Sequence, residues 1–148
     1  MIQNFESLWL NSSLMKTKLP DCLADWIDRK MPELGGVRRV RIIFCDSLPF
    51  EWLPGDRSKI EGITLWGEIY LRSRFHPIDP HDPDKIELLL HELVHVEQFR
   101  KNPLLFPINY LLEHVKTGYW DNPAEVEARS RAEKLMKEYL LEDICRGF

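Results

Sequence analysis

The chain lacks several features that mark large classes of protein. It has no long basic block and no interleaving of aromatic with basic residues, and its net charge is −4 with a pI near 5.7. Nucleic acid is therefore not an expected partner. The chain also has no run of the ~18 apolar residues that a membrane span needs, so neither a membrane-spanning segment nor a membrane partner is predicted.

Cysteine is scarce, and the three cysteines stand far apart at Cys22, Cys45 and Cys145. Their odd number and wide spacing argue against a disulfide framework and against a cysteine-based zinc site. The N-terminus has no cationic stretch followed by a long apolar run, so no signal peptide is predicted. A cytoplasmic location is the simplest interpretation, and the oligomeric state is left open.

What the sequence does contain fits one globular domain. The chain has 148 residues, of which 30% are charged and 44% hydrophobic. This length supports a sizeable core, and this composition is not that of a disordered chain. No repeat or low-complexity tract interrupts it. We predict a single domain over residues 1–148.

The most informative segment is His91-Glu92-Leu93-Val94-His95, which reads H-E-x-x-H within an apolar, helix-like stretch. Residues four apart lie on one face of a helix, so His91 and His95 can present two imidazoles to one metal ion. Glu92 stands beside them as a candidate base. Leucines and valines fill the far side of this helix, so it should be buried, and buried polar side chains need partners. The alternative is an ordinary helix in which these three residues meet no metal.

A catalytic zinc needs a third protein ligand, and the best candidate lies in a second predicted helix. This helix is expected to begin after Asn122 and to end near Glu142. On a helical wheel Glu125 falls within the apolar arc, whereas Glu127 falls on the charged, solvated face. Two alternatives stay open: Glu125 can instead form a capping box with Asn122, and His114 can instead be the ligand.

Together, the motif and the segment Asn-Pro-Ala-Glu125-Val-Glu-Ala, thirty residues after His95, resemble the zincin metallopeptidases of the Glu-ligand type (gluzincins). The resemblance covers mainly residues 84–132 and is closest to small bacterial zincin-like proteins. It implies a zinc peptidase in which His91, His95 and Glu125 bind Zn²⁺. Glu92 would then be the general base that activates water for attack on a peptide carbonyl. The resemblance also implies an Asp or Asn four residues after the third ligand, but here that position is Arg129.

The remaining segments predict an α+β fold with a small, mainly antiparallel sheet packed on the metal-binding helix and a helical C-terminal half. Asp82 or Asp84 is expected to cap the motif helix. The other predicted helices are at 5–16, 21–31 and 104–117, and the predicted strands are Val37–Phe44, Ile63–Trp66 and Glu68–Arg72. By resemblance, Glu68–Arg72 is a candidate edge strand for binding an extended peptide, although a plain internal strand is equally consistent.

The predicted function is hydrolysis of a peptide or protein substrate by a zinc-activated water. The oxyanion would need a further donor, and the sequence does not select among Tyr110, Tyr119 and His114. Histidine and carboxylate ligands also accept Mn, Co, Ni or Fe. Alternative functions are a zinc-binding protein with a structural, regulatory or partner-binding role, and an inhibited enzyme in which Cys22 or Cys45 caps the zinc.

Overall fold

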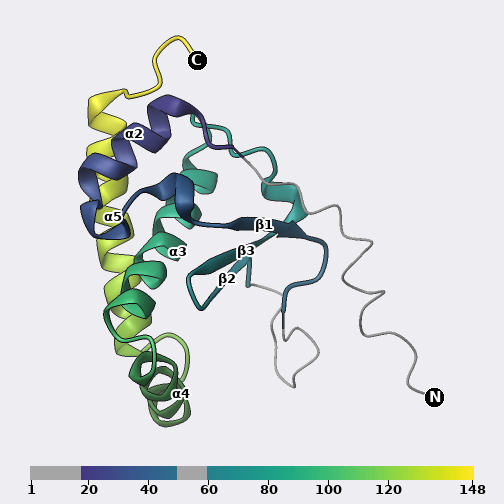
Figure 1. Cartoon of the computed structure of the whole chain (residues 1–148), viewed down its shortest axis with the longest axis vertical. Helices are drawn as coiled ribbons and strands as arrows, with labels where there is room; N and C mark the ends of the chain where they lie inside the picture. The colour runs from purple at the N-terminus through teal and green to yellow at the C-terminus, as the bar shows by residue number, and fades with distance from the viewer. Residues whose placement is uncertain (1–17, 50–59) are drawn as a thin grey trace, which may run out of the picture.

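The structure, a computed structural model, describes residues 18–49 and 60–148 (Figure 1). The predicted α+β class is confirmed, and the helix predicted at 5–16 lies outside the described residues. In chain order, the elements are α2 (Asp21–Lys30), 3-10 turns at Pro32–Leu34 and Val37–Arg39, β1 (Ile42–Cys45), β2 (Gly62–Leu65), β3 (Glu68–Arg72), a 3-10 turn at Ser73–Phe75, α3 (Pro83–Lys101), α4 (Leu105–Thr117) and α5 (Pro123–Glu142).

The sheet is mixed rather than mainly antiparallel. Its strand order is β1-β3-β2, with β1 parallel to β3 and β2 antiparallel to β3. Ile69 of β3 has Ile42 on one side and Thr64 on the other. Of the two alternatives for β3, the plain internal strand is therefore confirmed and the edge strand is wrong, because both of its sides are already hydrogen-bonded. Among the described strands, β2 is the edge that lies against α3.

The predicted strand Val37–Phe44 is correct only in its last three residues, 42–44. Residues Val37–Arg39 form a 3-10 turn, and β1 begins at Ile42. The preceding Gly36 has a φ of 106°, and the Val37 N–H donates to the Asp28 carboxylate at 2.6 Å. This contact to α2 holds the chain in a turn, which a residue pattern read locally does not reveal.

Helix α3 begins at a well-formed N-cap. The side chain of Asp82 accepts hydrogen bonds from the backbone N–H groups of Asp84 and Lys85, and Pro83 occupies the first helical position. Asp82, rather than Asp84, is therefore the cap, and it satisfies amides that have no partner within the helix. Its carboxylate also suits the positive end of the helix dipole.

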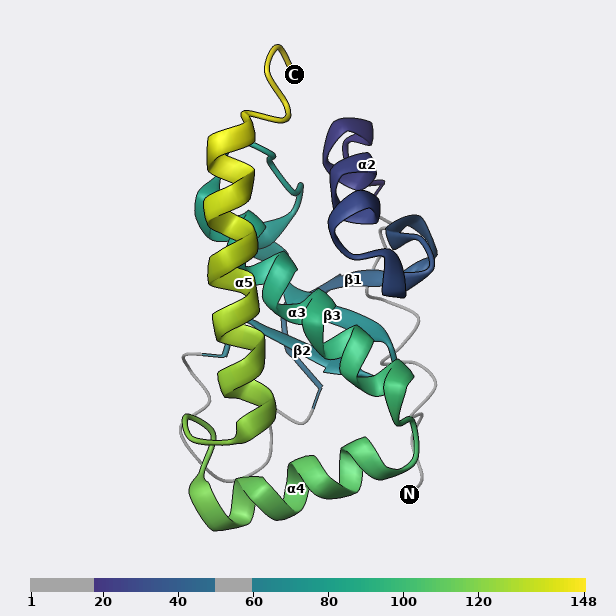
Figure 2. The ribbon, with the colours of Figure 1, turned by 90° about the vertical axis from the view of Figure 1, so that its left-hand side faces the viewer.

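The hydrophobic core surrounds α3, which lies between α5 and the sheet (Figures 1 and 2). Five of its leucines and valines are fully buried, as the motif's apolar context predicts; they are Leu89, Leu90, Leu93, Val94 and Val96, while Leu88 is half-buried. Helix α4 lies across one end of the molecule, below α3 and α5 in Figure 2, and none of its residues is fully buried. In the described part of the chain, no helix is long and apolar enough to cross a membrane.

A disulfide joins Cys22, in the first turn of α2, to Cys145, just after α5. The two Cα atoms are 5.5 Å apart, although 123 residues separate them along the chain. The expectation that these cysteines form no disulfide is therefore wrong, because only the folded chain brings them together. A disulfide is unusual in a reducing compartment, and the cytoplasmic location stays a prediction.

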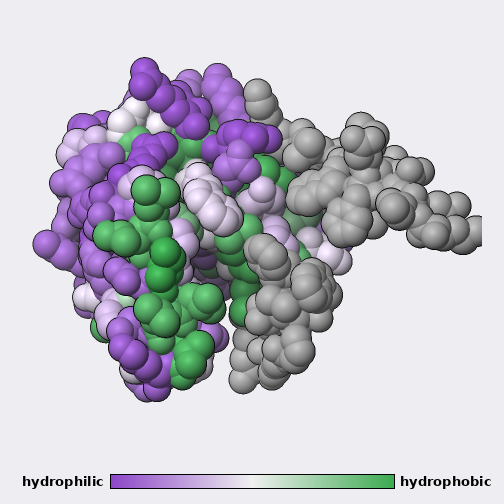
Figure 3. All heavy atoms as spheres, turned by 60° about the horizontal axis from the view of Figure 1, so that its bottom comes forward, coloured by the Kyte–Doolittle hydropathy of each residue, from purple (hydrophilic) through white to green (hydrophobic). Residues whose placement is uncertain are grey.

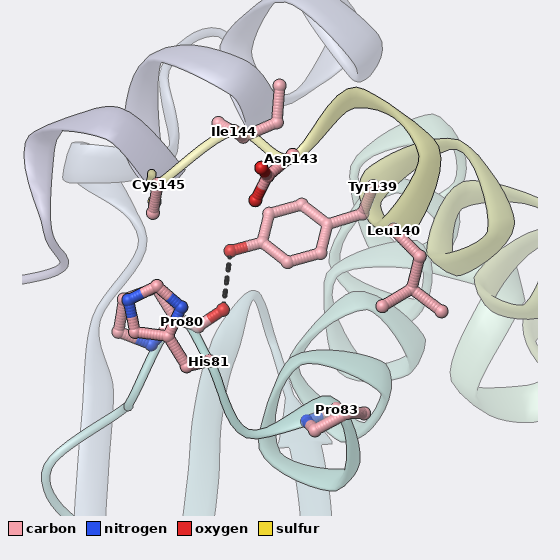
Figure 4. Close-up of a pocket in the computed structure, with 8 residues that line it drawn as sticks. All are labelled: Pro80, His81, Pro83, Tyr139, Leu140, Asp143, Ile144 and Cys145. Carbon is pink, nitrogen blue, oxygen red and sulfur yellow. Dashed lines mark hydrogen bonds between the residues drawn. The ribbon is translucent and has the colours of Figure 1, made fainter. Parts of the chain in front are cut away.

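Around the disulfide, α2 and α5 are further connected by side chains. The Trp26 indole N–H donates to Glu142, and the Lys30 ammonium pairs with Glu138 and Glu142 at 2.7 and 2.6 Å. The Tyr139 hydroxyl donates to the carbonyl of Pro80 at 2.7 Å, across a cavity of about 130 Å³ (Figure 4). This end of α5 is thereby connected to the loop that leads into the cap of α3.

Candidate metal centre

Three side chains predicted as ligands come together in the structure: His91, His95 and Glu125. The Nε2 atoms of His91 and His95 are 3.1 Å apart. They lie 3.2 and 3.3 Å, respectively, from the two carboxylate oxygens of Glu125. Two successive turns of α3 supply the histidines, and the first turn of α5 supplies the glutamate.

These distances fit a metal ion held by all three side chains. Metal–ligand bonds of about 2.0–2.1 Å around a tetrahedral zinc put neighbouring ligand atoms roughly 3.3 Å apart. Glu125 is only 3% exposed, and its Oε2 atom accepts no hydrogen bond from the described residues. A buried carboxylate oxygen without a donor is costly, and a bound cation would compensate for that cost.

The protonation states of the three side chains without metal follow from their burial and from their closeness to one another. Burial lowers the pKa of His95, but the adjacent Glu125 and the charge of Glu92 outweigh this effect and raise it to about 9. Burial alone would raise the pKa of the Glu125 carboxyl, but the two imidazoles beside it hold that pKa well below its usual range. Without metal, then, an imidazolium and a carboxylate share the site.

A hydrogen bond from α4 fixes the carboxylate of Glu125. The Tyr110 hydroxyl donates to Glu125 Oε1 at 2.7 Å, and the Asn122 side-chain amide donates to the Tyr110 carbonyl at 3.0 Å. Asn122 also caps α5 by accepting from the Ala124 N–H. Its own N–H donates to the Tyr119 carbonyl, not to Glu125. Asn122 is therefore an ordinary N-cap, and the capping-box alternative for Glu125 is wrong, because the glutamate faces the histidines instead.

Gln98 orients His95 from one turn further along α3. Its amide nitrogen donates to the Ala124 carbonyl and to Glu127, at 3.1 and 3.0 Å. Its amide oxygen therefore faces His95 Nδ1 at 2.7 Å, and because this oxygen only accepts, Nδ1 must donate. In neutral His95 the remaining nitrogen, Nε2, then has its lone pair directed towards Glu125 and His91, as a metal ligand requires.

Arg129 occupies the position at which the resembled peptidases often have an acidic or amide side chain. Its guanidinium lies over the Trp120 ring, 5.1 Å from the ring centre, and donates to the Trp120 carbonyl. It therefore does not orient a histidine. Gln98, on the same helix as the histidines, does so instead.

Glu92 lies between α3 and the edge strand β2, with 3% of its surface exposed. Burial raises the pKa of its carboxyl, while the neighbouring His95 and His91 act in the opposite direction. The Thr64 hydroxyl donates to its Oε2 atom at 2.6 Å. A Cβ atom on Gly62 would lie 2.9 Å from its Oε1 atom, so any other residue at this point of β2 would force the Glu92 side chain to shift.

The other candidates lie outside the group of three. His114 is exposed on α4 and stacks on Tyr110 at 6.3 Å between ring centres. Glu127 faces solvent, as predicted, and touches the site only through Gln98. Cys22 is in the disulfide, and Cys45 donates to the Leu71 carbonyl at 3.7 Å. Among the residues that the structure describes, neither cysteine belongs to a possible metal-binding group.

Sequence reasoning missed Gln98, Thr64 and Gly62. The spacing of Gln98, three residues after His95, is a helical neighbour spacing and could have indicated its role. Thr64 and Gly62 have no such local signal, because their contacts with Glu92 depend on how β2 packs on α3.

Comparisons of the chain with protein-family models, with curated proteins and with solved structures gave no match.

Proposed function

We propose that the protein is a zinc-dependent peptidase. The observation that carries this proposal is the convergence of two imidazoles and the buried carboxylate of Glu125. A second carboxylate, that of Glu92, lies beside them. Two nitrogen ligands and one oxygen ligand leave a fourth tetrahedral position open, which is typical of catalytic rather than structural zinc sites. A zinc ion here would supply the Lewis acidity that makes water nucleophilic near neutral pH.

The role proposed for Glu92 is proton transfer. Its carboxylate accepts a proton from the attacking water and later delivers that proton to the leaving amine. The raised pKa of Glu92 favours this cycle, because the protonated form becomes accessible nearer to neutral pH. Thr64 holds one carboxylate oxygen in place, and Tyr110 does the same for Glu125, so both acids have fixed positions.

We propose that the peptide substrate binds along β2. Within the described residues, β2 pairs only with β3, and the strand passes directly over Glu92 at Gly62 and Thr64. An extended peptide added at this edge would form main-chain hydrogen bonds and lie next to the proposed base. This assignment replaces β3, which has no open side.

A zinc-binding protein without peptidase activity is the second candidate. It is favoured by the environment of Glu92, a residue that is 3% exposed and whose carboxylate already accepts a hydrogen bond from Thr64. A base that is so enclosed must meet water through a local opening. The metal would then serve mainly to connect α3 to α5.

The deciding experiment measures the metal content of protein purified without added metal or chelator. We expect about one zinc per chain, lost in Glu125→Ala and kept in Glu133→Ala, the matched control with an exposed carboxylate further along the same helix. Peptide hydrolysis should require metal and disappear in Glu92→Gln, while the zinc stays bound. Zinc without hydrolysis would favour the second candidate, and no zinc after zinc is offered would exclude both.

A further inference from the structure

Helix α4 carries a stripe of exposed aliphatic side chains, which we name the α4 stripe. Each member has between 53% and 81% of its surface exposed; the members are Leu104, Leu105, Ile108, Leu111, Leu112 and Val115. Figure 3 shows apolar side chains gathered on this end of the molecule. Isolated exposed leucines are common on proteins, but a contiguous aliphatic face usually marks a binding surface.

The stripe faces away from the candidate metal centre. At about 100° per residue, its members fall on the side of α4 opposite Phe106 and Tyr110. Those two rings face inward, where Phe106 packs on Phe99 at 4.7 Å between ring centres and Tyr110 donates to Glu125. The inner side of α4 thus supports the site, while the outer side is exposed within the described structure. A substrate held at the metal would not explain the stripe.

We propose that the α4 stripe docks on the surface of a lipid bilayer that contains anionic headgroups. The position of α4 supports a planar partner, since the helix lies across one end of the molecule with α3 and α5 on one side of it (Figure 2). Its 13 residues make a helix about 20 Å long, too short for a hydrocarbon core of about 30 Å. It would therefore lie in the interface, with its aliphatic side among the acyl chains.

The charges around the stripe fit this partner. Residues 100–118 contain the cations Arg100, Lys101 and Lys116 but a single acid, Glu113, in a chain whose net charge is −4. On the helical wheel Glu113 falls on the inner side, and it pairs with Lys116 at 3.4 Å. Lys101 pairs with Glu33 at 3.4 Å, so the fully unpaired excess is small, but residues 100–118 carry three cations against one acid. Their long side chains can reach anionic headgroups.

Composition distinguishes a bilayer from a protein partner. The energetic centres of protein interfaces are enriched in Trp, Tyr and Arg, whereas the α4 stripe consists of Leu, Ile and Val alone. The exposed Trp120 follows the helix by three residues and is 67% accessible, at the end where Lys116 lies. Indole rings beside a cation suit the headgroup layer. Docking here would hold the candidate metal centre, on the inner side of α4, close to the membrane surface.

Co-sedimentation with lipid vesicles tests this proposal and requires neither metal nor hydrolysis. The full chain is mixed with vesicles of phosphatidylcholine alone or of phosphatidylcholine with phosphatidylglycerol. We expect binding to both, stronger with phosphatidylglycerol and weakened by salt. Leu111→Glu should lower the partition coefficient by at least about tenfold.

Leu141→Glu is the matched control, because it makes the same change at an 86% exposed position of α5. It should bind vesicles as the wild type does, and both variants should keep the wild-type circular dichroism spectrum. The proposal fails if the wild type does not sediment with vesicles, or if the two variants lose binding equally. A wild-type dimer that ignores vesicles and is dissociated by Leu111→Glu would instead show that the stripe is an interface between copies of this chain.

Discussion

The amide oxygen of Gln98 lies 2.7 Å from Nδ1 of His95, on the side of the imidazole that faces away from Glu125. Partners of this kind usually tune metal affinity by fixing the ring orientation and tautomer of a ligand. Here the partner comes from the same helix as the ligand, one turn on, and is itself held by Ala124 and Glu127 of α5. Gln98 therefore connects the position of α5 to the orientation of His95.

Replacing Gln98 should weaken metal binding without removing a ligand. We expect Gln98→Ala to lower zinc affinity by about 10- to 100-fold, because His95 loses both its orientation and the acceptor for its Nδ1–H. Competition with a chromophoric chelator measures this change. Glu133→Ala, on an exposed part of α5, serves as the control. Equal affinities for both variants would show that Gln98 does not support the ligand.

Zinc affinity should rise with pH. Because the pKa of His95 is about 9 in the metal-free protein, zinc must displace a proton from this ring at neutral pH. For each proton displaced, the apparent zinc affinity increases about tenfold per pH unit. This increase should continue up to about pH 9, above which His95 is mostly unprotonated. Chelator competition at a series of pH values measures the slope. An affinity that is flat between pH 7 and 9 would contradict the raised pKa.

The stability of the metal-free protein should change with pH in the opposite direction. The folded-state pKa of His95 is raised from 6.5 to about 9, so protonation favours the folded state. This contribution is fully present below pH 6.5, declines as the pH rises, and is lost above about 9, at a cost of up to about 3 kcal/mol. Urea unfolding of chelator-treated protein measures it, with His95→Gln as the variant that should lack this pH dependence.

Gly62→Ala should disturb Glu92 without touching the metal ligands. The added Cβ would lie 2.8 Å from Leu71 Cδ2 and 2.9 Å from Glu92 Oε1, so both side chains would have to move. We expect a loss of about 1–3 kcal/mol in the free energy of unfolding, as in other overpacked cores, with zinc content unchanged. Combining it with Glu92→Ala removes one of the two clashes and should recover part of the loss. If Gly62→Ala and the double variant both unfold with the free energy of the wild type, β2 does not approach α3 this closely.

Cys145→Ser should lower the free energy of unfolding by about 2–5 kcal/mol, because the disulfide closes a very long loop in the unfolded chain. Urea unfolding with and without a reducing agent measures the effect. Reduction should bring the wild type to the stability of the variant and leave the variant unchanged. A wild type that is insensitive to reductant would show that the disulfide does not contribute to stability.

The parts of the site that lie on helices could be predicted from the sequence, because helical periodicity is a local property. The wheel separated Glu125 from Glu127, and the spacing of His91 and His95 placed them on one face. The disulfide, the strand order and the contacts of Glu92 with Thr64 and Gly62 could not be predicted in this way. They join residues that are distant in the chain, and only tertiary packing decides which of them meet.

The turn at Val37–Arg39 shows how a local pattern can also mislead. Its alternation of apolar and charged residues is typical of a strand, yet Val37 is buried in a 3-10 turn whose N–H is bound to Asp28. Likewise, β3 has the composition of a strand, but its position in the sheet depends on β1 and β2. A local residue pattern predicts the type of an element more reliably than it predicts which elements lie beside it.

The disulfide between Cys22 and Cys145 also affects how self-cleavage would be detected. It encloses every helix and strand that the structure describes, apart from the first residue of α2. A single backbone cut anywhere inside that loop would leave two fragments covalently joined and running as one band without reductant. If the protein digests itself during storage, only electrophoresis after reduction would show it.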